Sequence, residues 1–77
     1  MNVSFADALK SIRQRCFLSQ EAFARELRVS FSSVNRWESG RSKPSLAAMK
    51  QLKAFCDEQK IDFAPVEKAW AEIGKEG

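Results

Sequence analysis

Two serines that lie eleven residues apart constrain the fold of this chain more than any other feature of its sequence. Ser19 and Ser30 each precede a short amphipathic stretch, and serine is a preferred helix N-cap because its hydroxyl accepts a hydrogen bond from a free amide of the first turn. A helix that follows Ser19 and ends by Leu27 or Arg28 leaves almost no chain before Ser30, since Arg28 and Val29 are all that separate the two. Helices joined by so short a turn must cross at a steep angle.

The second of these helices, Phe31–Glu38, is predicted to have two faces with different chemistry. Successive side chains are rotated by about 100° around a helix axis. Three side chains point toward the core, namely Val34, Trp37 and Glu38. Three hydrogen-bonding side chains form a strip on the opposite side, namely Ser32, Asn35 and Arg36. Phe31 and Ser33 lie on the boundary between these faces.

Three further helices are predicted from apolar residues that recur every three or four positions. The first spans about residues 4–16, is capped by Ser4 and carries Phe5, Leu9, Ile12 and Cys16. After a loop at 39–44, Ser45 caps a helix whose apolar stripe is Leu46, Met49, Leu52 and either Phe55 or Cys56. Asp62 caps a last helix, about residues 63–73, with Phe63, Val66, Trp70 and Ile73. Since no stretch alternates like a strand, we expect a compact all-α five-helix bundle formed as one domain by residues 1–77.

Composition excludes several classes of function. The chain is 44% hydrophobic and 30% charged, which is typical of a globular domain, and it has no histidine and no tyrosine. We therefore expect no catalytic site, no metal site and no cofactor. Cys16 and Cys56 lie on apolar faces and read as free thiols of a cytoplasmic protein, with a disulfide between them as the alternative. No apolar run approaches the length of a membrane span, so no membrane association is expected.

Charge is unevenly distributed along the chain. Residues 1–44 carry a net charge of +4 and all six arginines, whereas residues 45–77 carry −1. Arginine is the side chain best suited to forked contacts with phosphate and guanine. An ordinary mixture of solvated charges explains the total of +3 but not this segregation, which favours a nucleic-acid partner.

The chain resembles the Cro and phage-repressor (XRE-like) helix-turn-helix family in two segments, LSQEAFA at residues 18–24 and VNRWESGR at residues 34–41. The resemblance covers about residues 5–60, with the motif itself at about 19–38, and it implies a DNA-binding domain of the phage-repressor type. Ala24 would lie where the two helices cross, because a larger side chain there would push them apart. Arg28 and Phe17 stand where glycine is usual or common, so Arg28 is expected in a left-handed conformation at some energetic cost.

The resemblance also implies roles for individual residues. Four side chains are expected to contact base edges in the major groove: Phe31, Ser32, Asn35 and Arg36. Eight residues are expected to contact the DNA backbone: Ser19, Gln20, Arg28, Ser30, Ser33, Arg41, Ser42 and Lys43. Glu38 would be costly to bury alone, and the family pattern implies an ion pair with Arg13. Phe31 has an alternative role as a hydrophobic cover over the turn.

Two classes of function compete. The first is a sequence-specific DNA-binding regulator of transcription, a repressor by expectation, which acts as a homodimer at least on DNA because one recognition helix contacts few base pairs. Helix 63–73 is then the candidate dimer contact, although it could equally close the core of a monomer. The second is a small module that binds another protein, such as an antitoxin, with DNA binding secondary. The outer face of helix 31–38 favours the first.

Overall fold

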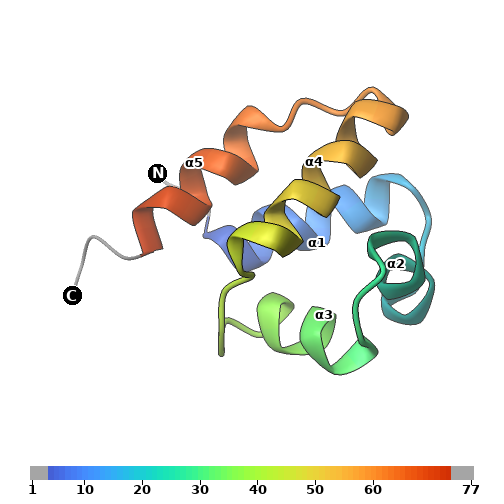
Figure 1. Ribbon diagram of the computed structural model, residues 1–77, viewed down its shortest axis with the longest axis horizontal. Coiled ribbons are helices and arrows are strands. Elements are labelled where there is room, and N and C mark those ends of the chain that lie inside the picture. Colours follow the sequence, from blue (N-terminus) through green and yellow to red (C-terminus); the bar gives the residue numbers. More distant parts are fainter. Residues whose placement is uncertain (1–3, 74–77) are drawn as a thin grey trace.

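A computed structural model describes residues 4–73 and shows five α-helices connected by short loops (Figure 1). The helices are α1 (Phe5–Arg15), α2 (Gln20–Leu27), α3 (Phe31–Glu38), α4 (Leu46–Gln59) and α5 (Ala64–Ile73). The predicted all-α, five-helix architecture is confirmed. α3 has the predicted bounds, while α1 and α5 each begin one residue later than predicted.

Local hydrogen bonds explain where the helices begin. Four serine hydroxyls each accept a hydrogen bond from the amide three residues ahead, at 3.0–3.2 Å: Ser4, Ser19, Ser30 and Ser45. At the start of α5, the Asp62 carboxylate accepts from the amide of Ala64 at 3.1 Å. Serine caps of this kind contribute about 1 kcal/mol each. The starts of α1 to α4 are therefore determined by single residues of the sequence.

Left-handed residues explain where four of the helices end. Phe17, Arg28 and Lys60 have φ angles of 57°, 60° and 59°, and Gly40 has 78°. In each case the next amide donates to a carbonyl five residues earlier, at 2.8–3.2 Å. Such a bond satisfies a carbonyl that would otherwise be left free at the helix end. A side chain makes the left-handed conformation unfavourable by about 1 kcal/mol, so three of the four turns carry some strain. The prediction for Arg28 is confirmed.

The core lies between α1 and the other helices. α1 packs against α3 and α5, and α2 packs against α3 and α4. In Figure 1, α3 runs along the lower edge and α5 along the upper left. Among residues 4–73, thirteen apolar residues are buried: Phe5, Leu9, Ile12, Phe23, Ala24, Leu27, Val34, Trp37, Met49, Leu52, Phe55, Cys56 and Val66. The rings of Phe23 and Phe55 meet edge to face, with centroids 5.5 Å apart, and join α2 to α4.

Three details of the predicted core change. Leu46 was predicted in the apolar stripe of α4 but is 65% exposed, because it occupies the first position of the helix, outside the packed surface. Ile73, at the last position of α5, is also exposed. Phe55 and Cys56 are both buried, where the pattern offered one or the other. Cys56 and the half-buried Cys16 are free thiols, so the disulfide alternative is wrong for this structure.

Candidate nucleic-acid interface

The α2–α3 unit is held together by a close crossing and a short turn. Ala24 is 3% exposed within this unit, so its small side chain permits α2 and α3 to pack directly against each other. Arg28 closes α2 in the left-handed conformation, and the Val29 amide donates to the carbonyl of Ala24 at 3.0 Å. Ser30 then caps α3. These local features determine the angle at which α3 leaves the turn.

The inner face of α3 is anchored in the protein. Val34 is completely buried, and Trp37 and Glu38 are 8% and 7% exposed. The three side chains point inward as the helical geometry predicts. A charged side chain at this depth requires partners, because an isolated carboxylate is very unfavourable in a low-dielectric environment.

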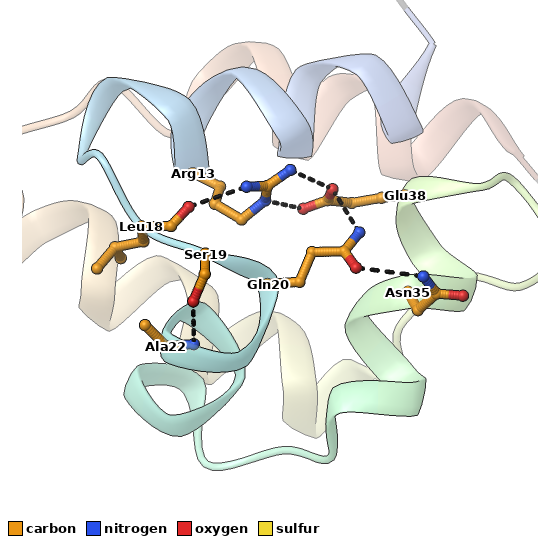
Figure 2. A network of polar contacts seen from close by, with 7 residues as sticks. All are labelled: Arg13, Leu18, Ser19, Gln20, Ala22, Asn35 and Glu38. Carbon is orange, nitrogen blue, oxygen red and sulfur yellow. Dashed lines mark hydrogen bonds and ion pairs between the residues drawn. The ribbon is translucent and has the colours of Figure 1, made fainter.

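Arg13 supplies the main partner of Glu38. Its Nε and Nη2 atoms donate to the two carboxylate oxygens at 2.8 and 2.9 Å, forming a two-pronged ion pair between α1 and α3 (Figure 2). Its Nη1 atom donates to the carbonyl of Leu18 at 2.9 Å. The hydrogen bonds to Glu38 raise the pKa of Arg13 above its usual value, although burial acts in the opposite direction. The guanidinium therefore joins α1, the start of α2 and α3.

Gln20 extends this network toward the outer face of α3. Its Nε2 atom donates to Oε1 of Glu38 at 3.0 Å, and its Oε1 atom accepts from Nδ2 of Asn35 at 3.2 Å (Figure 2). The predicted backbone contact of Gln20 thus competes with bonds inside the protein. Spacing along the sequence gave no indication of the bond between Gln20 and Asn35, because the two residues lie fifteen positions apart on crossing helices.

The outer face of α3 is accessible. Ser32, Asn35 and Arg36 are all exposed, and Phe31 at the start of the helix is 48% exposed. Half of the Phe31 surface faces solvent, so it does not act only as a cover over the turn. Ser33 is half-buried, and its hydroxyl lies 2.9 Å from that of Ser30. Four side chains predicted to contact bases therefore share one open surface.

Basic side chains surround this surface. Arg28 lies at the turn before α3, and Arg41, Ser42 and Lys43 lie in the loop after it; all four are exposed. The ammonium group of Lys43 lies 5.2 Å from the centre of the Trp70 ring. Trp70 in turn donates its indole N–H to the carbonyl of Pro44 at 2.9 Å. This contact was not predicted, since a backbone carbonyl has no signature in the sequence, and it ties the loop to α5.

Within residues 4–73, no group of three or more histidine, cysteine, aspartate or glutamate side chains is placed to hold a metal ion. No helix in the same region is long and apolar enough to cross a membrane. The site consists of one rigidly anchored helix that presents polar, basic and aromatic side chains beside further cations.

Comparisons with known proteins agree with this description. A family model described as helix-turn-helix matches residues 9–59. The match ends with the last residue of α4, so α5 lies outside it. Over 53 residues the chain is 32% identical to the HTH-type transcriptional activator BcrR of Enterococcus faecalis, an alignment that covers 69% of this chain and 26% of that protein. The chain thus spans about a quarter of the length of this relative. No solved structure matches it.

Proposed function

Because this chain belongs to the helix-turn-helix family of DNA-binding transcription regulators, we propose that it binds a specific sequence of double-stranded DNA by inserting α3 into the major groove. The observation that carries the proposal is the division of α3 into two faces. Val34, Trp37 and Glu38 anchor the inner face in the protein. On the outer face, Ser32, Asn35 and Arg36 are exposed to solvent. The major groove of B-DNA is wide enough to admit a helix and presents a distinct pattern at each base pair.

Two residues of the open face, Arg36 and Phe31, have a specific target in the major groove. Arg36 can donate in a fork to O6 and N7 of guanine, the commonest specific contact in protein–DNA complexes. Phe31 can contact the methyl group of thymine. Ser32 can donate to or accept from several bases and is therefore less selective. Asn35 lies beside Arg36 on the same face, with its amide partly engaged by Gln20.

Phosphate contacts position the domain on the duplex. Arg28 on one side of α3, and Arg41, Ser42 and Lys43 on the other, provide charge and hydrogen bonds for the backbone. The starts of α2 and α3 add main-chain amides at Ser19, Gln20 and Ser30, because the N-terminal end of a helix attracts anions. Ser33 contributes through its hydroxyl, since its amide donates to Ser30. The hydroxyls of Ser19 and Ser30 already cap α2 and α3, so these two residues contribute to phosphate binding mainly through their backbone amides.

A second copy of the chain completes the binding unit. Val66 is 1% exposed in the α1–α5 contact, so α5 closes the monomer core. The neighbouring surface is open: an apolar groove of about 150 Å³ between α4 and α5 is lined in part by Leu46, Phe63 and Trp70. A second copy seated there would bury the exposed Leu46, and the dimer is expected to present its two α3 helices to successive major grooves, about 34 Å apart. Leu46→Lys should weaken dimer formation on DNA in sedimentation experiments, whereas Lys68→Ala, an exposed residue of α5 that does not line this groove, should not.

Regulation of transcription follows from occupancy of the site. A dimer bound over a promoter excludes the polymerase, so we expect repression in the cytoplasm where the DNA is accessible. The name of the Enterococcus faecalis relative describes that protein as an activator. A reporter with the bound site placed over its promoter should lose expression when the protein is present. An increase in expression would assign activation instead.

Selection of bound sites from random duplex DNA tests the proposal. The wild-type chain should enrich a symmetric site at moderate salt, and Arg36→Ala should lose the preference for guanine at one pair of each half-site. Lys68→Ala provides the matched control, because it removes an exposed charge of α5 that belongs neither to the α3 face nor to the groove between α4 and α5. No enriched sequence with the wild-type chain would refute DNA recognition. An unchanged preference in Arg36→Ala would refute only the role of Arg36.

A further inference from the structure

The hydrogen bonds that run from Arg13 to Asn35 have only one chemically allowed direction. Arg13 can only donate, and it donates to both oxygens of Glu38. An ionised carboxylate can only accept. The next residue, Gln20, has an amide with one donor end and one acceptor end, and either end could in principle face Glu38. The acceptor end would face the carboxylate with no proton between them, so the donor end must face it.

This constraint passes through Gln20 to the outer face of α3. Because Nε2 of Gln20 is directed at Glu38, its Oε1 atom faces the opposite way, where it accepts from Nδ2 of Asn35 at 3.2 Å. The Oδ1 atom of Asn35 then points away from the network, as Figure 2 shows. The buried ion pair between Arg13 and Glu38 thus determines which end of the exposed Asn35 amide is offered to a ligand.

From this polarity we propose that Asn35 reads its base pair as a hydrogen-bond acceptor and that Gln20 is the positioning residue that fixes this orientation. The inference rests on the proposed insertion of α3 into the major groove. There, only the N4 amino group of cytosine and the N6 amino group of adenine donate. An asparagine free to turn would use both ends of its amide on adenine N6 and N7. With one Nδ2 hydrogen donated to Gln20 and Oδ1 directed away from the network, Asn35 offers its acceptor end and selects cytosine or adenine against guanine or thymine.

Binding measured at a defined base pair tests this inference. The wild-type site is first obtained by selection, and the pair governed by Asn35 is the one whose preference changes in Asn35→Ala. At that pair, competition between the four bases should show cytosine and adenine bound about tenfold more tightly than guanine and thymine in the wild type. Asn35→Ala should reduce this ratio below about twofold, the other positions being unchanged. Asn35→Asp retains an acceptor and should keep the preference for cytosine or adenine.

Gln20→Met separates orientation from simple contact. Methionine has a similar length but cannot accept from Asn35, so the amide becomes free to turn and can bond to adenine through both of its ends. Adenine should then stay preferred, while the advantage of cytosine over guanine and thymine should fall to about threefold or less. A loss of overall affinity alone would accompany any structural damage, whereas the identity of the preferred base reports the orientation of Asn35.

Several results would overturn the inference. One is a wild-type preference for guanine or thymine at the pair governed by Asn35. Another is an Asn35→Ala variant that retains every preference of the wild type, and a third is a reversed preference in Asn35→Asp. Discrimination that is unchanged in Gln20→Met would remove the positioning role of Gln20. If the wild-type chain enriches no site, the proposed function itself fails, and this inference fails with it.

Discussion

Replacing Arg13 alone should destabilise the protein more than replacing Arg13 and Glu38 together, because the single change leaves the buried Glu38 carboxylate without its main partner. The Arg13 side chain is 15% exposed and that of Glu38 is 2% exposed, so neither ion can be fully hydrated when its partner is removed. Removal of one member of a buried pair typically costs about 3–5 kcal/mol. In Arg13→Met, Glu38 keeps one hydrogen bond, from Gln20, and we expect a loss of about 3 kcal/mol.

The reciprocal change should be milder, because Arg13 is closer to solvent and retains the carbonyl of Leu18. We expect Glu38→Met to cost about 2 kcal/mol. In the double variant both charges are gone and two apolar side chains of suitable size replace them, which is often nearly neutral. Because the Leu18 carbonyl and the Gln20 amide lose their partners, the double variant should still lose about 2 kcal/mol in total, which corresponds to a coupling of about 3 kcal/mol between the two sites.

Urea unfolding measured by circular dichroism and by fluorescence of Trp37 and Trp70 provides the four free energies. A chain of 77 residues is stable by only about 4–12 kcal/mol, so Arg13→Met could unfold at low urea. Arg13→Lys keeps the charge without the fork and serves as the milder variant, with an expected loss of about 1 kcal/mol. A coupling below about 0.5 kcal/mol would refute the argument that the pair acts as a unit.

Three further predictions follow from the helix ends, the buried thiol and the basic loop. Lys60→Gly should raise the free energy of unfolding by about 0.5 kcal/mol, because glycine adopts the left-handed conformation without steric cost; an unchanged or lower midpoint in urea would contradict this. Burial raises the pKa of Cys56 from 9.0 to about 11, so the unfolded chain loses this proton first and stability should fall as the pH rises from about 9 to about 11. Cys56→Ala should lack that part of the decline, and equal declines in both proteins would rule out the thiol as its source. Arg41→Ala and Lys43→Ala should each reduce the slope of log affinity against log salt by about 1, whereas Lys68→Ala should not change it; equal slopes in all three would remove the proposed phosphate contacts.

Features that depend on neighbours in sequence were predictable. Ser19 and Ser30 defined the starts of α2 and α3 because a cap acts within its own turn. Val34 and Trp37 were assigned to the core because helical rotation alone separates the two faces of α3. The left-handed conformation of Arg28 was predicted because family resemblance places a glycine at that position.

Features that depend on what lies opposite in space were not predictable. Leu46 follows the apolar periodicity of α4, but no described helix covers it, and periodicity carries no information about the opposing surface. Lys60 ends α4 in the left-handed conformation although lysine does not signal such a turn. The partner of Glu38 came from the family resemblance. The bond from Asn35 to Gln20 required the coordinates, because two crossing helices bring these side chains together.

Chemical probing of the major groove tests the central claim most directly. Dimethyl sulfate methylates guanine at N7 in the major groove and adenine at N3 in the minor groove, so protection of each atom by bound protein reports which groove is occupied. The proposed dimer predicts two groups of protected guanine N7 atoms, centred about 10 base pairs apart on one face of the duplex. Arg36→Ala should lose protection of one guanine in each group. Guanine N7 atoms that stay as reactive as in free DNA, with protection confined to adenine N3, would contradict insertion of α3 into the major groove.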